Sequence, residues 1–545
     1  MTIEITIFPG GQTVSCSTGV RLHEALAQAG ETPATPCGGN GTCGKCTVQV
    51  APGRLHDAER NVATRVLACQ YPVREPLTLW LSEESQRHED VQILTSTDFR
   101  PKEASNACPE ARSPKPKACR YAVAVDIGTT TIVAELICLL TQRACGVQAC
   151  HNPQAEFGDD VISRIQYASE SPDKAARLRK VVVDVVNELI AVLAHGESIS
   201  PEQITQVAIA GNTTMQQLFA GLDVQSLGHS PFEPATKHYP PAPAADYGLI
   251  IPPEGTVRLF PVIGGFVGGD LVAGIIATQL CSQNAPSLLI DIGTNGEILL
   301  WQPDGRLLLA SATAAGPAFE GARISQGMIA ATGAMERVVI GDTLHVETIG
   351  NQPARGICGS GLIDLVAELL RIGAVATSGK LLTANRLPET VPLTIRDRFV
   401  TVDNKPAFVI VPQIASAVDR PILLTQHDIR QVQLAAGAVR AGITLLLRKA
   451  KIPPNDLANV FLAGGFGNYI RRENAQRIGL LPPEIPTERI RFCGNTSLAG
   501  AKTVLLNASC CDTMQKCADL AECVDLSKSP DFAAVFAESM LFPKV

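Results

Sequence analysis

The sequence is poor in aromatic residues and has no long uninterrupted apolar run. Aromatic side chains account for 4% of the 545 residues, whereas glycine occurs 45 times. This balance suits an α/β fold, in which many tight turns join strands to helices. The longest apolar stretch, around residues 121–140, contains Asp126, Glu135 and several threonines. It therefore predicts two buried strands joined by a turn and argues against a membrane-spanning helix.

Further absences narrow the function. No Gly-Lys-Ser or Gly-Lys-Thr sequence is present, which argues against a P-loop ATPase. No basic and apolar leader begins the chain and 17 cysteines are present, so we expect a cytoplasmic protein with reduced thiols. The formal net charge of −7 argues against nucleic acid or a membrane as the main partner. A chain of this length is expected to form about three or four domains.

Four cysteines near the N-terminus form the most specific pattern. Cys37, Cys43 and Cys46 lie in one glycine-rich segment, with gaps of five and two residues, and Cys69 follows later. This spacing is close to the plant-type 2Fe–2S pattern, and the glycines allow the backbone to direct N–H groups at sulfur. Zinc is the alternative, but zinc sites favour two close cysteine pairs and only one occurs here. The pattern predicts one 2Fe–2S cluster held by these four thiolates.

The residues around these cysteines predict the domain that carries them. Thr2–Phe8 alternates as a strand, a hairpin turn follows at Gly10–Gly11, and a second strand begins at Val14. Residues 20–29 then have helical spacing. This order resembles that of ubiquitin-like (β-grasp) 2Fe–2S ferredoxins, and the first cysteine gap resembles the adrenodoxin type. Cys16 is expected in the core of this ferredoxin and not at the cluster.

A second motif occurs twice. An apolar strand ends at Asp126 and is followed by glycine and three threonines, and about 165 residues later Asp291 ends a matching strand. In such a hairpin, glycine admits a phosphate, backbone and hydroxyl groups donate to it, and the aspartate approaches Mg²⁺ through water. A third apolar strand, 460–464, ends in glycines that can press against adenosine. The residues predicted to contact ATP are Gly128, Thr129, Thr130, Thr131, Gly293, Thr294, Asn295, Gly464, Gly465, Gly467 and Asn468.

In this order the three motifs resemble the phosphate 1, phosphate 2 and adenosine motifs of the acetate kinase, sugar kinase, heat-shock chaperone and actin superfamily, which implies a duplicated ribonuclease H-like ATPase core. Segments 264–274 and 495–501 resemble its two connecting helices, whose small residues allow close crossing at a hinge. The resemblance places Asp270 in the cleft, where it would orient the attacking water or a Mg²⁺-bound water. Helix capping or a salt bridge is the alternative for Asp270. Glu297 and Glu320 are further candidates.

The domain organisation follows from these motifs. We expect a ferredoxin domain at 1–84, a polar and proline-rich linker at 85–119, a first ATPase lobe at 120–284 and a second at 285–545. The complete chain is thus predicted to be an α/β multidomain protein. Its catalytic residues are predicted to be Asp270, Asp126 and Asp291.

A ferredoxin joined to this ATPase core resembles the reductive activators of corrinoid proteins. The resemblance implies that the protein takes an electron at its cluster and uses ATP to return an inactive corrinoid protein of a methyltransferase system from Co(II) to Co(I). It also implies an upstream electron donor and a homodimer. The stretches that carry it are 210–215, 264–270, 291–297, 315–322, 356–364, 462–468, 494–501, 529–532 and 540–543.

Three other functions stay open at this point. One is an ATP-driven electron donor such as the activators of 2-hydroxyacyl-CoA dehydratases, which hold a 4Fe–4S cluster on cysteines of the ATPase domain. Another is a small-molecule kinase with a redox-sensing ferredoxin, and the last is an electron-transfer scaffold without ATPase activity. Cys358 is expected to be structural. The tail cysteines, Cys510, Cys511, Cys517 and Cys523, are expected to lie in a helix and loop as incidental thiols.

Overall fold

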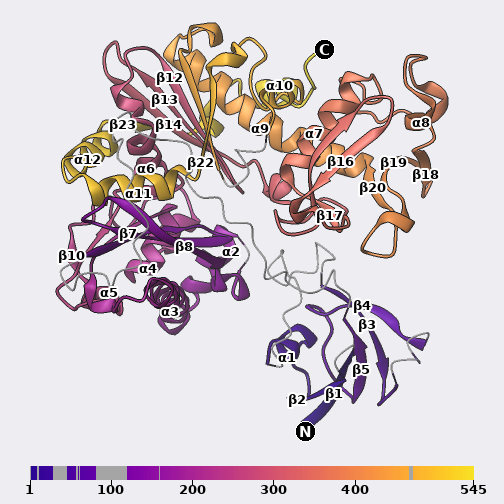
Figure 1. Ribbon diagram of the computed structural model, residues 1–545, viewed down its shortest axis with the longest axis horizontal. Helices are drawn as coiled ribbons and strands as arrows, with labels where there is room; N and C mark the ends of the chain where they lie inside the picture. Colours follow the sequence, from indigo (N-terminus) through magenta and orange to yellow (C-terminus); the bar gives the residue numbers. More distant parts are fainter. Residues whose placement is uncertain are drawn as a thin grey trace. The chain divides into compact units, whose positions relative to one another are not determined.

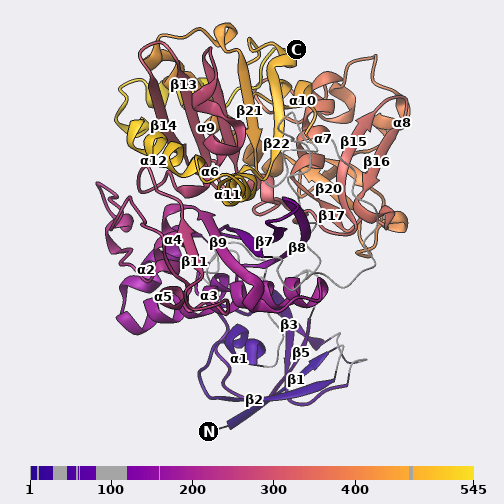
Figure 2. The ribbon, with the colours of Figure 1, turned by 60° about the vertical axis from the view of Figure 1, so that its left-hand side comes forward.

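The chain is described by a computed structural model, shown in two views in Figures 1 and 2. The described residues are 2–8, 11–28, 46–56, 59, 62–81, 120–158, 160–464 and 470–544. They form two compact units, which we describe separately. The first comprises Met1–Asp90 with Pro153–Tyr167, and the second comprises Val91–Asn152 with Ala168–Val545.

The first unit contains a five-stranded mixed sheet covered by one helix. The strands have the order β2-β1-β5-β3-β4, in which β1 runs parallel to β5 and antiparallel to β2. Alternate residues of β1 are buried, so that Ile3, Ile5 and Ile7 face the helix residues Leu22 and Leu26 in one core. The elements are β1 (Thr2–Phe8), β2 (Gln12–Ser17), α1 (Leu22–Gln28), β3 (Thr47–Pro52), β4 (Thr64–Leu67) and β5 (Leu77–Trp80).

This arrangement confirms the predicted β-grasp ferredoxin fold. The strand at Thr2–Phe8 has the predicted bounds, and the helix begins two residues later than the predicted 20–29. Cys16 is 5% exposed and belongs to the core, as expected. The predicted linker, 85–119, lies outside the described residues.

The second unit contains two six-stranded sheets of matching topology. In each sheet, the first three strands along the chain are antiparallel neighbours. Two later strands lie on the other side of the first strand and run parallel to it. The orders are β10-β11-β9-β6-β7-β8 and β22-β21-β12-β13-β14-β23. The predicted duplication is therefore confirmed. The strands are β6 (Tyr121–Ile127), β7 (Thr131–Cys138), β8 (Arg143–His151), β9 (Ile204–Gly211), β10 (Ala242–Pro243), β11 (Thr256–Leu259), β12 (Ser287–Ile292), β13 (Gly296–Gln302), β14 (Leu307–Thr313), β21 (Asn459–Ala463), β22 (Ile490–Gly494) and β23 (Ala521–Cys523).

Two helices lie between these sheets. Helices α6 (Gly269–Thr278) and α11 (Thr496–Leu506) cross each other, and their apolar residues join one core with residues of both sheets (Figure 2). The outer faces are covered by longer helices, as binary patterning requires. The other helices of the described residues are α2 (Val161–Ser169), α3 (Pro172–Gly196), α4 (Thr213–Ala220), α5 (Ala244–Tyr247), α7 (Gly359–Arg371), α8 (Leu393–Arg396), α9 (Gln426–Ala450), α10 (Arg472–Arg477), α12 (Cys510–Leu520) and α13 (Phe532–Ser539).

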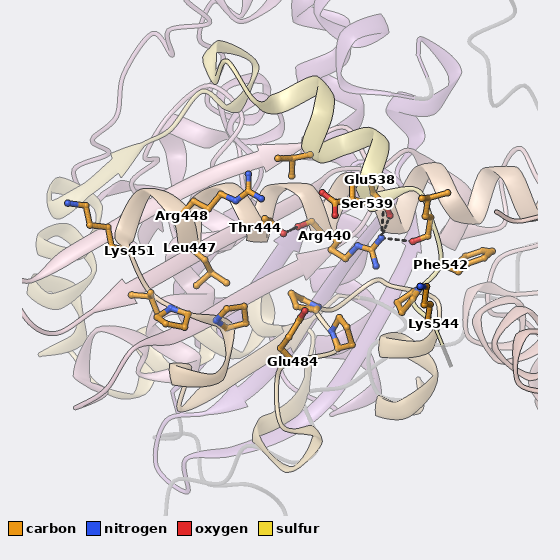
Figure 3. A pocket seen from close by; sticks show the side chains of 18 residues that line it. Arg440, Thr444, Leu447, Arg448, Lys451, Glu484, Glu538, Ser539, Phe542 and Lys544 are labelled. Atoms are coloured by element: carbon orange, nitrogen blue, oxygen red, sulfur yellow. Dashed lines mark hydrogen bonds between the residues drawn. The ribbon is translucent and has the colours of Figure 1, made fainter. Parts of the chain in front are cut away.

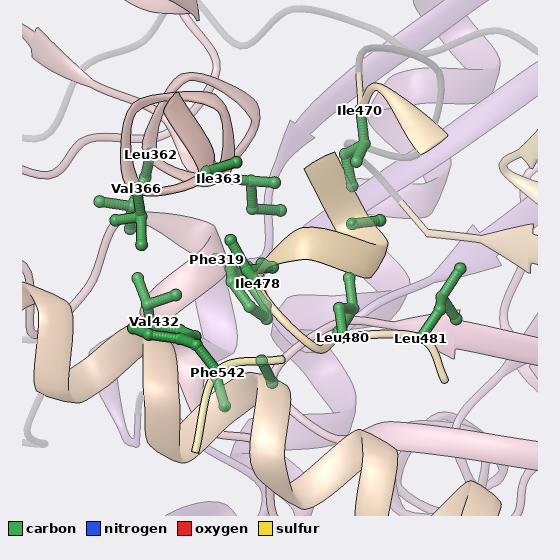
Figure 4. Close-up of a cluster of buried hydrophobic side chains, with 14 of the residues drawn as sticks. Phe319, Leu362, Ile363, Val366, Val432, Ile470, Ile478, Leu480, Leu481 and Phe542 are labelled. Atoms are coloured by element: carbon green, nitrogen blue, oxygen red, sulfur yellow. The ribbon is translucent and has the colours of Figure 1, made fainter. Parts of the chain in front are cut away.

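The second half also carries an insertion with two small sheets. Helix α7 and the start of α9 pack with this insertion in a large core, into which the C-terminal Phe542 also inserts (Figure 4). Phe542 is 3% exposed, and burying a side chain of this size contributes about 1.5–3 kcal/mol. The sheets consist of β15 (Ala334–Ile340), β16 (Leu344–Thr348) and β17 (Gly356–Ile357), and of β18 (Phe399–Val402), β19 (Lys405–Val411) and β20 (Ile422–Thr425).

Regular structure occurs in two places where composition favours a loop, and in the tail, at Cys523, it corrects the expected loop. The proline-rich region 229–261 contains β10, α5 and β11, because the alternating residues of β11 add to the parallel edge at β9. In the tail, β23 pairs with β14, which gives a three-residue segment an extended structure that its local sequence does not specify. None of the helices in the described ranges is both long and apolar enough to cross a membrane.

Candidate functional site

The two predicted phosphate motifs form matching hairpins. At the end of β6, Gly128 N–H donates to the Thr131 carbonyl at 3.0 Å, and after β12, Gly293 N–H donates to the Asn295 carbonyl at 3.0 Å. A side chain at position 128 would not fit, because its Cβ would lie 2.6 Å from the Thr131 carbonyl oxygen. Each half of the duplicated core thus presents one tight turn at the end of its first strand.

One carboxylate connects the two hairpins. Glu320, at the end of a short 3-10 helix (Pro317–Glu320), accepts a hydrogen bond from Thr294 Oγ1 at 2.9 Å and one from Thr130 Oγ1 at 3.5 Å. Thr129 accepts a bond from Asn212 Nδ2 at 2.9 Å. Burial raises the pKa of Glu320, and the two threonine bonds oppose that rise. The structure therefore brings the threonines of both predicted phosphate motifs together.

Asp126 and Asp291 end the equivalent strands β6 and β12. Asp126 accepts hydrogen bonds from Asn495 Nδ2 at 2.8 Å and from Ser497 Oγ at 2.7 Å. Burial raises the pKa of Asp126, and these two bonds oppose the rise. Burial and the charge of Asp126 raise the pKa of Asp291 to about 7. The charge of one aspartate therefore acts on the other.

Asp270 lies in the first turn of α6 and belongs to the same cluster. Burial, followed by the charge of Asp291, raises the pKa of Asp270 to about 8. Glu297, which pairs with Asp291 in the register of β12 and β13, has its pKa raised well above the usual range by burial and by these two aspartates. Asp270 Oδ1 accepts a bond from the Leu271 N–H at 2.8 Å, so it also has a local capping contact.

The composition of this cluster fits a cation. Among the described residues, none of these carboxylates forms an ion pair with lysine or arginine, so no basic side chain offsets the burial and mutual charge that raise their pKa values. Nor do three such side chains come close enough, in the part of the chain that is described, to ligate a metal directly. A hydrated Mg²⁺, held through its water molecules, suits both observations because Mg²⁺ gives up its water reluctantly.

The connecting helices cross at a distance that only glycine permits. A Cβ at Gly500 of α11 would lie 2.1 Å from the Ala273 carbonyl oxygen of α6. A Cβ at Gly274 would lie 2.9 Å from the Leu289 side chain of β12. The prediction that small residues allow these helices to cross closely is confirmed.

The predicted adenosine motif is described only at its start. Strand β21 runs parallel to β12 and ends at Ala463. The next residue is Gly464, whose φ of +116° and close approach to the Ile292 carbonyl exclude a larger residue. Gly465, Gly467 and Asn468 lie outside the described residues.

Two of the predicted cluster ligands are described. Cys46 and Cys69 are both fully buried, and their sulfur atoms lie 3.2 Å apart. Gln70 Nε2 contacts the Cys69 sulfur at 3.7 Å. Thiolate ligands about 2.3 Å from one tetrahedral metal ion lie about 3.8 Å apart, so these two thiols need to separate only slightly to bind the same ion. Cys37 and Cys43 lie outside the described residues.

Three other cysteines of the described residues have contacts that bear on their roles. Cys358 is buried and its thiol donates to the Met335 carbonyl, as expected of a structural residue. In the tail, Cys517 of α12 forms a hydrogen bond with Cys281, which follows α6, and this bond lowers the pKa of Cys517 and raises that of Cys281. This thiol pair could not be predicted from the sequence, since Cys281 and Cys517 lie far apart in the chain.

A cavity of about 750 Å³ lies elsewhere, between the end of α9 and the C-terminal segment (Figure 3). Arg440 crosses it and donates to the carbonyls of Ser539 and Leu541. None of the predicted nucleotide or cluster residues lines this cavity. Its arginine is occupied by the C-terminal backbone, so it serves to hold the tail.

Three contacting residues were missed by sequence reasoning. Asn212, Asn495 and Ser497 lie in segments that the motifs include, but their bonds to Thr129 and Asp126 were not foreseen. Asn212 and Asn495 are N-cap residues of α4 and α11, so helix-start signals could have identified them as caps. The hydrogen bonds from these two side chains to Thr129 and Asp126 could be identified only from the structure.

Three family models match successive parts of the chain. Residues 5–74 match a 2Fe–2S iron–sulfur cluster binding domain, 121–283 match the RACo middle region, and 285–545 match the C-terminal domain of RACo, the ASKHA domain. The fold class predicted from the sequence is thereby confirmed.

Relatives of similar length are also found. The chain is 31% identical to the corrinoid activation enzyme RamQ of Eubacterium limosum, over 93% of each chain. It is 25% identical to the [Co(II) methylated amine-specific corrinoid protein] reductase of Methanosarcina barkeri, over 71% of this chain and 70% of the relative. The solved structure of a reductive activator for corrinoid, iron–sulfur protein covers 99% of this chain and 98% of its own, with a TM-score of 0.72 and 31% identity.

Proposed function

This chain belongs to the family of corrinoid activation enzymes, and we propose on that basis that it is an ATP-dependent reductive activator of a corrinoid protein. In this function an electron enters at the N-terminal 2Fe–2S cluster and passes to an inactive Co(II) corrinoid protein of a methyltransferase system, which returns to Co(I). The single observation that carries the proposal is that one chain joins a ferredoxin fold, with a buried cysteine pair, to a duplicated core whose two hairpins meet at Glu320.

The proposal assigns the site residues as follows. Cys37, Cys43, Cys46 and Cys69 hold the cluster, and the close pair Cys46 and Cys69 binds the same iron. When bound, the cluster supplies one electron at a time. The other residues of the site bind the nucleotide through the two hairpins and the glycine-rich segment after β21. The proposed domains are a ferredoxin domain at 1–84, a linker at 85–119, a first ATPase lobe at 120–284 and a second at 285–545.

In the ATPase site the carboxylates have separate tasks. Asp126 and Asp291 face the hydrated Mg²⁺ of ATP, and Asp270 orients the attacking water. Mg²⁺ bound with ATP would supply positive charge near these buried carboxylates and so favour their ionised forms, and closure of the two halves of the core around the nucleotide would bring them to it. ATP therefore changes the conformation of the activator and its client and donates no phosphoryl group to a substrate.

Other parts of the proposal concern partners. The client is a corrinoid protein, an upstream reductase supplies the electron, and the activator forms a homodimer. The cysteine-rich composition supports a reducing cytoplasm as its location.

One experiment tests the proposed function. The visible spectrum of a candidate corrinoid protein is followed under anaerobic conditions with the cluster-loaded chain and a reductant, with and without ATP. We expect Co(I) bands to form in sustained amounts only with ATP. Equal Co(I) formation without ATP, or with a variant that does not hydrolyse ATP, would contradict the proposal. ATP turnover stimulated by a sugar or an acid instead would favour the kinase alternative.

A further inference from the structure

The Asp126 carboxylate at the end of β6 is held by a helix from the far end of the chain. Asn495 Nδ2 donates to its Oδ2 at 2.8 Å, and Ser497 Oγ donates to its Oδ1 at 2.7 Å. Both donors lie at the start of α11, 369 and 371 residues after Asp126. Each oxygen of the carboxylate thus accepts one hydrogen bond, and the two bonds together fix the orientation of the carboxylate.

Local structure explains why these two side chains reach Asp126. Asn495 is the N-cap of α11, and its Oδ1 accepts a bond from the Leu498 N–H at 2.8 Å. This bond fixes the amide so that its N–H group faces the aspartate. Gly494, with a φ of +60°, turns the chain from β22 into the cap. Ser497 follows in the first turn and is 4% exposed.

A second contact fastens the same helix to the same sheet. Lys502 Nζ, further along α11, lies 2.7 Å from Glu135 Oε1 on β7, whose side chain is 5% exposed. The start and the middle of α11 are thus bonded to two neighbouring strands of the first sheet. The position of α11 on that sheet is therefore set by polar contacts as well as by apolar packing.

We propose that Asn495 and Ser497 are positioning residues, which hold the Asp126 carboxylate in the orientation that binds the hydrated Mg²⁺ of the nucleotide. A carboxylate has about four acceptor positions, and the two donors occupy two of them. The two that remain can accept hydrogen bonds from Mg²⁺-bound water. This inference rests on the proposed function, because it assumes that Asp126 faces the nucleotide-bound cation.

The test is a nucleotide-binding measurement on the full-length, cluster-loaded chain. Binding of a fluorescent ADP analogue is titrated with Mg²⁺ for the wild type and for Ser497→Ala and Asn495→Ser. The second substitution keeps an N-cap acceptor but removes the amide donor. We expect half-saturating Mg²⁺ to rise about tenfold in each variant, as the loss of one bond to a charged group implies. Analogue affinity at saturating Mg²⁺ should change less than twofold.

Two further variants separate positioning from a structural role. Ser497→Thr keeps the hydroxyl and should restore the wild-type Mg²⁺ dependence. Thr503→Ala removes a hydroxyl from the same helix that only bonds the Ala499 carbonyl, and should leave Mg²⁺ dependence unchanged.

The outcomes distinguish the inference from the proposed function. Wild-type Mg²⁺ dependence in Ser497→Ala would overturn the inference, and so would a Ser497→Thr variant as impaired as Ser497→Ala. If the wild-type chain bound no nucleotide, the proposed function would fail first, and this inference would fail with it.

Discussion

The close crossing of α6 and α11 predicts that an added side chain at Gly500 lowers the free energy of unfolding. In Gly500→Ala the new Cβ would lie 2.1 Å from the Ala273 carbonyl oxygen and 2.6 Å from its Cα. Ordinary contacts are more than 1 Å longer, so the helices must separate along their whole crossing. Overpacking of this kind costs about 3 kcal/mol, whereas alanine gains about 1 kcal/mol over glycine in a helix. The net loss is about 2 kcal/mol.

The chain offers a matched control for this change. Gly196, the last residue of α3, has no atom within 4 Å of an added Cβ. Gly196→Ala therefore gains helix propensity without a clash. In a thermal unfolding measurement on the full-length chain, a loss of about 2 kcal/mol lowers the transition midpoint by about 2 °C, because the entropy of unfolding grows with the size of the unit. A midpoint in Gly500→Ala that equals or exceeds that of Gly196→Ala would refute the close-crossing argument.

Three more predictions concern charge and the cluster. Because the folded pKa of Asp270 is about 8, well above the ordinary pKa of about 4 for an aspartate, the folded chain holds the extra proton, and Mg²⁺-free stability should fall as pH rises from about 4 to 8. Asp270→Asn should flatten that slope in melting curves, and an unchanged slope would contradict the assigned pKa. Cys46→Ser should abolish the 2Fe–2S absorption and bound iron, while Cys16→Ser should retain both. Lys502→Met leaves the buried carboxylate of Glu135 unpaired and should lower the free energy of unfolding by about 3–5 kcal/mol in melting experiments. Lys180→Met, at an exposed ion pair, should lower it by less than about 1 kcal/mol. Equal losses in the two variants would refute this contrast.

Much of the fold could be predicted because its signals are local. The alternation of Thr2–Phe8 and the repeated strand-to-turn motifs at Asp126 and Asp291 depend on neighbouring residues, and the structure has strands and turns at those places. Residues 174–193 also carry a helical apolar pattern, and they lie within α3, Pro172–Gly196. Such elements need no knowledge of the rest of the chain.

The features that were missed depend on partners distant in sequence. Strand β23 exists because the edge of β14 is available, and nothing in its three residues indicates an extended structure. Asn495 could be predicted as a helix cap, but its bond to Asp126 joins residues 369 positions apart. The pKa values near Asp270 likewise arise from a cluster that forms only after both halves fold. Non-local contacts of this kind leave no periodic pattern.

The attachment of α11 to the first sheet limits how far the two halves of the core can fold separately. Although α11 comes from the second half of the chain, it covers the inner face of the first sheet, and without it that face would be open to water. The alanine-rich face and the α11 residues in that core are Ala122, Ala124, Ala208, Ala210, Leu498, Ala501, Val504 and Leu505. A chain cut between the halves would therefore yield a first fragment with an apolar surface and a second with an unsupported helix. The duplicated halves resemble each other in topology, yet the first half depends on a helix of the second to cover the inner face of its sheet.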